Sequence, residues 1–231
     1  MRVRKFEGFW QVTLLPGVFP VSVYLVEEQD GLTLVDTGLP FMASGILRVT
    51  GRLGRPIRRI VLTHGHMDHA GGLDRLKDSL PDARVASSSR EAVLLSGDLS
   101  LRPGESPSGK NPPGSWVKAR TTPDDLLEDG DSVGPLTAVA TPGHTPGHMA
   151  YFHEPSGAVF AGDAFQVQGG LGVAGQPRPW FPFVAPATWN KTLALSSARR
   201  LAELPVRYLA ATHGDVLADP VPAMLRAIEA N

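Results

Sequence analysis

Four potential metal ligands lie within six consecutive residues, and no other feature constrains the fold of this chain as strongly. Residues 63–72 read Thr-His-Gly-His-Met-Asp-His-Ala-Gly-Gly, after an expected strand and before an expected helix. Alternate residues of an extended segment share a face, so His64 and His66 can point to one ion. Asp68 and His69 continue towards a second ion. A solvated, histidine-rich turn is the alternative, but burying these imidazoles without metal would leave donors and acceptors unpaired.

Further potential ligands follow three later strands. His144 lies in the run Thr-Pro-Gly-His-Thr-Pro-Gly-His at residues 141–148, and His213 follows the last expected strand. Asp163 ends another strand, where its two oxygens could bridge two cations. Histidine and carboxylate ligands fit zinc, manganese or iron, and a soft-metal site is disfavoured because the chain has no cysteine. The missing cysteine also excludes a disulfide scaffold and a thiol nucleophile.

Length, composition and charge exclude several classes of protein. The chain has 231 residues, 42% hydrophobic and 19% charged, which predicts one globular domain over residues 1–231. Its 22 Lys+Arg and 23 Asp+Glu give a net charge of −1, which argues against a mainly electrostatic nucleic-acid binder. The longest apolar runs have four residues, whereas a membrane-spanning helix needs about 20. Because no small-residue cleavage pattern follows the N-terminal segment, we expect a cytoplasmic protein without a membrane or nucleic-acid partner.

Hydrophobic patterning predicts an alternation of strands and helices, which is typical of an α/β layer architecture. The expected strands cover residues 21–26, 32–35, 57–63, 84–86, 136–140, 149–152, 158–160 and 208–211. The expected helices cover residues 41–53, 73–80, 91–95, 187–204 and 222–230. Two segments rich in Pro and Gly, 97–125 and 169–186, are predicted to be irregular.

In motif content and order, the sequence resembles the metallo-β-lactamase superfamily. The matching motifs are Val-Asp-Thr-Gly at 35–38, His-x-His-x-Asp-His at 64–69, Thr-Pro-Gly-His at 141–144, Gly-Asp at 162–163 and His-Gly at 213–214. They span about residues 20 to 215, and the resemblance implies an α/β fold of the αββα four-layer sandwich type. It also implies one metal on His64, His66 and His144, a second on Asp68, His69 and His213, and Asp163 as the bridge. Asp36 would orient a ligand rather than bind metal.

The implied chemistry is that of a dinuclear hydrolase with two divalent ions, zinc in the first place and manganese or iron as alternatives. Two cations that share a water lower its pKa towards neutrality, so that hydroxide attacks a polarised carbonyl or phosphoryl centre. Asp68 is the expected proton shuttle because it is both a ligand and a base. An ester, thioester or lactone of a small molecule is the expected substrate.

Several departures from known branches bear on the substrate. Zinc β-lactamases that share the 64–69 motif lack the bridging Asp, whereas Asp163 is present here, so a β-lactamase is disfavoured. The 141–148 run resembles glyoxalase II, but only 18 residues follow His213, too few for the helical extension that holds glutathione there. Quorum-quenching lactonases have a tyrosine three residues after the bridging Asp, where this chain has Gln166. Ribonucleases are disfavoured by the neutral charge, and a phosphodiesterase is a further, less favoured alternative.

Two other classes stay open beside hydrolysis. Sulfur dioxygenases of the same superfamily bind one iron through two His and one Asp, which have counterparts at His64, His144 and Asp163. This mononuclear iron enzyme is the main alternative. A metal-binding partner protein without catalysis would be expected to lack ligands, and none is missing here.

Aromatic residues in and just before the second irregular segment form a candidate substrate wall. Residues 169–186 could cover the metals as a lid, and the same holds for 97–125; a dimer contact or a satellite core is the alternative, so a homodimer is one expectation. The histidines His148 and His153 are not counted as ligands. The candidate wall residues are Phe165, Trp180, Phe181 and Phe183.

Overall fold

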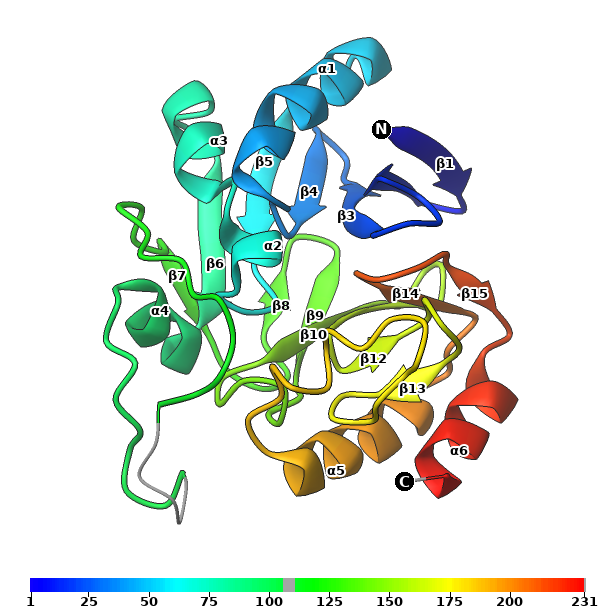
Figure 1. The fold of residues 1–231 in the computed structure, drawn as a ribbon. Helices are drawn as coiled ribbons and strands as arrows, with labels where there is room; N and C mark the ends of the chain where they lie inside the picture. Colours follow the sequence, from blue (N-terminus) through cyan, green and yellow to red (C-terminus); the bar gives the residue numbers. More distant parts are fainter. Residues whose placement is uncertain (106–110, 231) are drawn as a thin grey trace.

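Two mixed β-sheets form the middle of the molecule (Figure 1). The computed structural model describes residues 1–105 and 111–230. The first sheet has the order β1 (Arg2–Phe6), β2 (Phe9–Leu14), β3 (Val21–Glu27), β4 (Leu32–Val35), β5 (Ile57–Val61), β6 (Arg84–Ser88) and β7 (Asp125–Leu127). The second has the order β15 (Leu217–Ala218), β14 (Tyr208–Ala211), β11 (Ala158–Gly162), β10 (Met149–His153), β9 (Leu136–Ala140) and β8 (Ser132–Val133). The short strands β12 (Phe165–Gln166) and β13 (Gly172–Val173) pair with each other.

The helices cover the outer faces of the two sheets. Figure 1 shows α1 and α3 outside the first sheet, and α5 and α6 outside the second. The helical elements are η1 (Pro40–Met42), α1 (Ala43–Leu53), α2 (Met67–Ala70), α3 (Leu73–Ser79), α4 (Ser89–Leu95), α5 (Lys191–Ala202) and α6 (Val221–Glu229). This is the predicted αββα sandwich. None of the helices in the described part of the chain has the length and apolar character needed to cross a membrane.

Three hydrophobic clusters correspond to the three interfaces between these four layers. One packs α1 and α3 against the first sheet, with Ile46, Leu76 and Ile60 among its members. The middle cluster lies between the sheets and includes Tyr24 and Phe160, whose rings are 5.1 Å apart. The third packs α5 and α6 against the second sheet. Each sheet is therefore buried on both faces, which explains why its strands are apolar over most of their length.

Strand direction brings several loops to one edge of the sandwich. In the first sheet β4 and β5 are parallel, and in the second β11 is parallel to β14. Strand β9 also runs parallel to β11, because both are antiparallel to β10, which lies between them. The segments that follow β4, β5, β9, β11 and β14 carry all the candidate ligands. The carboxyl ends of parallel strands are where α/β proteins generally build their sites.

The predicted elements are confirmed in position, with differences at several ends. The helix expected from residue 187 begins at Lys191, because the side chain of Asn190 accepts a hydrogen bond from the Leu193 N–H and caps it. The strand expected to reach Thr63 ends at Val61. The hairpin of β1 and β2 was not predicted, since β1 is largely exposed and has no alternating apolar pattern.

Candidate metal centre

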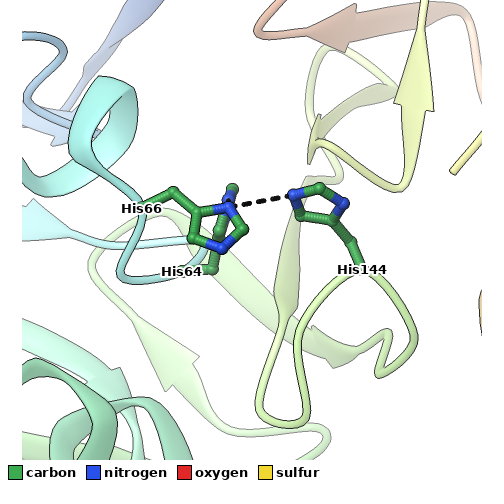
Figure 2. Close-up of side chains that lie close together, drawn as sticks. All are labelled: His64, His66 and His144. Atoms are coloured by element: carbon green, nitrogen blue, oxygen red, sulfur yellow. Dashed lines mark hydrogen bonds between the residues drawn. The ribbon is translucent and has the colours of Figure 1, made fainter. Parts of the chain in front are cut away.

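Three histidines from two loops converge on one point. His64 and His66 follow β5, and His144 follows β9 (Figure 2). The Nδ1 atom of His66 lies 3.0 Å from His64 Nε2 and 3.1 Å from His144 Nε2. These three residues form one of the groups whose ligand atoms all lie within 4.8 Å of one another. The geometry suits a single cation held by three imidazoles.

Hydrogen bonds on the outer ring nitrogens select the tautomer of each of these histidines. His66 Nε2 lies 3.1 Å from the Pro113 carbonyl, so it carries the proton. The hydroxyls of Thr63 and Thr188 donate to other acceptors, Asp36 and a backbone carbonyl respectively. They therefore accept from His64 Nδ1 and His144 Nδ1, each at 3.1 Å. The three inward nitrogens are left with their lone pairs, which is the arrangement that a metal ligand requires.

A second group consists of Asp68, His69 and His213. The outer nitrogens are again fixed, since His69 Nδ1 lies 2.8 Å from Asp36 Oδ2 and His213 Nδ1 lies 2.8 Å from the Pro20 carbonyl. Their Nε2 atoms face inward, and His213 Nε2 lies 3.2 Å from Asp68 Oδ2. Asp36, placed by sequence as an orienting residue, contacts His69 and the backbone N–H of Thr63.

Asp163 lies between the two groups and faces both. Its Oδ2 atom is 3.4 Å from His144 Nε2, whereas its Oδ1 atom is 3.5 Å from both His69 Nε2 and His213 Nε2. Asp163 Oδ1 and His69 Nε2 are buried and have no hydrogen-bond partner. Burying polar atoms without a partner costs free energy unless a bound ligand supplies the missing interaction. A histidine and carboxylate donor set with such atoms fits divalent cations.

The histidines of the first group and His213 of the second group differ in protonation state, because burial and nearby charge shift their pKa values in opposite directions. Burial lowers the pKa of His64 and His144 well below the ordinary value and that of His66 to about 4, so these imidazoles are neutral. Burial also opposes charge on His213, but Asp163 and Asp68 outweigh it and raise its pKa to about 10. Neutral imidazole is the form that binds metal. The first group is therefore ready to bind, whereas metal bound to His213 must displace a proton.

Sequence reasoning missed the buried carboxylate of Glu91, which joins the two loops of the first histidine group. Its Oε2 accepts from the Gly65 N–H at 2.9 Å, and its Oε1 accepts from the Gly147 N–H at 3.0 Å and the Thr145 hydroxyl at 2.5 Å. Gly65 lies between His64 and His66, and Thr145 follows His144. Burial raises the pKa of Glu91 to about 7, against the effect of these hydrogen bonds. A helical Glu in an ordinary position of α4 gives no local signal of this role.

Replacing Glu91 is expected to loosen both loops. Glu91→Ala leaves two buried N–H groups without acceptors, so the free energy of unfolding should fall by about 2 to 4 kcal/mol. Glu91→Gln retains one acceptor oxygen and should lose less. Urea unfolding with an unchanged m-value, together with metal content per chain, measures both effects. The exposed Glu203 provides the control substitution to Ala, and an Ala variant at position 91 as stable as that control would contradict the role.

His148 holds the backbone of Asp163 in place through a hydrogen bond. Its Nε2 accepts the backbone N–H of Asp163 at 3.2 Å, and its Nδ1 lies 2.8 Å from the Thr141 hydroxyl. Burial lowers the pKa of His148 to about 3, which keeps the ring neutral and able to accept. His148 thus holds the backbone from which Asp163 projects.

A pocket of about 320 Å³ opens over both groups. Of the four aromatic residues predicted as a substrate wall, Phe183 lines this pocket. Phe165 and Phe181 are buried in the core cluster beneath, although Phe181 lies 4.9 Å from the ring of His213. Trp180 is 86% exposed and lies outside the lining. The irregular segment 169–186 therefore reaches the pocket through its final residues.

The other irregular segment also contacts the site. The N–H of Met67 donates to the Ser115 carbonyl, and the ring of Trp116 lies 4.6 Å from that of His66. Gly114 has φ +110°, and a Cβ there would lie 2.2 Å from His66 Nε2. Only glycine allows the chain to pass so close to the histidine. Residues 113–117 thus form part of the site, which the sequence left undecided.

Comparison with known proteins agrees with this geometry. The family model for the metallo-beta-lactamase superfamily matches residues 16–213. The chain belongs to the metallo-β-lactamase superfamily. Most members of this superfamily are metal-dependent hydrolases, and the described part of this chain contains His/Asp groups that could hold metal ions.

The similar proteins of this superfamily include both uncharacterised proteins and proteins named as hydrolases. Uncharacterized protein YobT of Bacillus subtilis strain 168 is 44% identical over 99% of this chain and 98% of its own length. A hydroxyacylglutathione hydrolase of Synechococcus sp. is 32% identical over 70% of this chain, which spans only 55% of that protein. Among solved structures, TTHA1623 in a di-iron-bound form has a TM-score of 0.66 and 26% identity, covering 94% of this chain and 97% of its own.

Proposed function

We propose that this chain is a dinuclear metal-dependent hydrolase that cleaves an ester, thioester or lactone carbonyl of a small molecule. The position of Asp163 carries the proposal, because its two oxygens face two separate groups of inward-pointing ligands. The di-iron form of the relative TTHA1623 is further support for two metals in this branch. Zinc is the proposed metal, with manganese or iron as alternatives.

The proposed ligand sets are those of the two groups. His64, His66 and His144 would hold one ion, and Asp68, His69 and His213 the other, with Asp163 shared. Two such ions would supply a water nucleophile at neutral pH and polarise the carbonyl of the substrate. Asp36 and the backbone carbonyl of Pro20 orient the two histidines of the second group through their Nδ1 atoms.

Asp68 is the proposed proton carrier. Its side chain is 24% exposed and lines the pocket, whereas Asp163 is almost fully buried. Burial alone would raise the pKa of Asp68, but the charge of His69 and the hydrogen bond from His213 hold it well below its ordinary value. Asp68 is therefore ionised and faces the pocket, which is the state in which it would accept a proton from water and return it to the leaving group.

Metal content and product analysis test this proposal together. The purified protein is expected to hold two zinc, manganese or iron ions per chain and to hydrolyse members of a panel of esters, thioesters and lactones. The main alternative is the mononuclear iron dioxygenase, which would hold one iron and consume oxygen with a sulfur substrate. One iron per chain with oxygen uptake and no hydrolysis would replace the proposed function with that alternative.

A further inference from the structure

The lining of the pocket divides into two chemical classes. Its polar members are His66, Asp68, His144, Asp163, His213 and Ser115. The first five belong to the proposed ligand sets and would be occupied in holding the metals. Ser115 is then the one polar side chain in the described lining that remains for the rest of the substrate, and it is exposed. The part of the substrate that does not react must therefore be recognised mainly by the apolar side chains that line the pocket.

The apolar members come from four separate parts of the chain. Phe19 lies between β2 and β3 and packs edge-on against Phe183, with ring centroids 5.0 Å apart. Phe19 also lies 5.9 Å from the ring of His213, so this aromatic wall adjoins the second ligand group. Leu39 follows β4, and Met67 begins α2 beside His66 and Asp68. The complete apolar lining consists of Phe19, Leu39, Met67, Phe183, Val184 and Ala187.

The described lining contains no lysine or arginine, and its fixed charges outside histidine are the carboxylates Asp68 and Asp163. A substrate carboxylate distant from the reacting carbonyl would lose its hydration there without gaining a partner, which is costly. Glutathione carries two carboxylates, so its thioesters fit this lining poorly. The volume of about 320 Å³ lies near the lower end of small-molecule sites.

From this lining we infer that the pocket takes an uncharged alkyl or small aryl acyl group, so that the substrate is a neutral ester, thioester or lactone rather than a glutathione thioester. This inference rests on the proposed function for its reaction but on the pocket walls for its specificity. Each methylene group buried against the walls contributes about fourfold in affinity. Affinity should therefore rise with the length of the acyl chain until the pocket is full.

Binding of a matched series of hydroxamic acids to the metal-loaded protein tests the inference without turnover. The neutral members run from acetohydroxamic to octanohydroxamic acid, and suberic acid monohydroxamate has the length of the last with a terminal carboxylate. Calorimetry should show affinity rising about three- to fourfold per methylene over the shorter members. The terminal carboxylate should weaken binding at least tenfold relative to octanohydroxamic acid. Metal content is measured before and after each titration.

Two phenylalanine variants locate the effect in the pocket. Phe183→Ala should flatten the dependence of affinity on chain length, because Phe183 lines the pocket and packs against Phe19. Phe41→Ala is the matched control, since Phe41 is 59% exposed and lies outside the lining. A dependence that is equal in both variants would overturn the inference, as would affinity that does not rise with chain length.

Hydrolysis of the corresponding thioesters of one neutral thiol separates this inference from the proposed function. Affinity that rises with chain length but no turnover of any thioester, ester or lactone would contradict the function and leave the pocket specificity standing. Turnover that is equal or faster with the terminal carboxylate would leave the function standing and overturn the inference. Rates that rise with neutral chain length support both.

Discussion

Asp163→Asn is expected to lower kcat/KM at least about a thousandfold and to reduce the metal content from two ions to at most one. The substitution keeps the shape of the side chain but removes its charge and one of its two acceptor oxygens. Those oxygens face His144 on one side and His69 with His213 on the other. If the charge of Asp163 stabilises the transition state by about 4 kcal/mol through the two proposed metals, its loss lowers the rate by about three orders of magnitude.

The Asp163 variant is measured against a matched substitution elsewhere. Asp30→Asn removes a carboxylate that is 68% exposed and pairs with Arg58 on the surface, so activity and metal content should not change. Far-ultraviolet circular dichroism establishes that both variants fold. An Asp163→Asn protein that retains two metals and the activity of the unmodified chain would show that the two ligand groups do not share this residue.

Asp68→Asn is expected to lower kcat by about a hundredfold to ten-thousandfold, with a smaller change in KM, because it removes the proposed proton carrier. The first ligand group does not include Asp68, so at least one metal should be retained. Assays across a range of pH with substrates of different leaving-group pKa distinguish the two roles of Asp68. A proton carrier matters most for a poor leaving group.

The conservative variant Asp68→Glu provides a further distinction. It keeps a carboxylate but displaces it, so partial activity is expected if proton transfer is the main role. Equal loss in the Asn and Glu variants, with loss of one metal in both, would indicate that Asp68 acts only as a ligand. Full activity of Asp68→Asn with both metals bound would contradict its place in the proposed mechanism.

Local spacing explains how much of the site could be predicted. His64, His66, Asp68 and His69 lie in one short segment, and ligand chemistry depends on residue type, so their grouping is visible in the sequence. The fold class was also predictable, because apolar strands alternate with amphipathic helices over most of the chain. The hairpin of β1 and β2 was not, since β1 is largely exposed.

Contacts between distant segments explain what was missed. Glu91 would be expected on the surface as a charged helical residue, and only the packing of α4 against residues 65 and 145–147 buries it. Phe19 and Phe183 form one wall although they are far apart in sequence. The aromatic segment 169–186 predicts three wall residues, but side-chain direction sends Phe181 into the core and Trp180 into solvent, so that only Phe183 lines the pocket.

The sequence by itself determined the fold class and the kinds of ligand atom available, because backbone periodicity and side-chain chemistry are local properties. Only the tertiary structure decided which nitrogen of each histidine faces inward, since Pro20, Asp36, Pro113 and Thr188 come from other loops. It also decided which apolar side chains line the pocket. Both depend on how two sheets pack, and burial and hydrogen-bond direction exist only after that packing has formed.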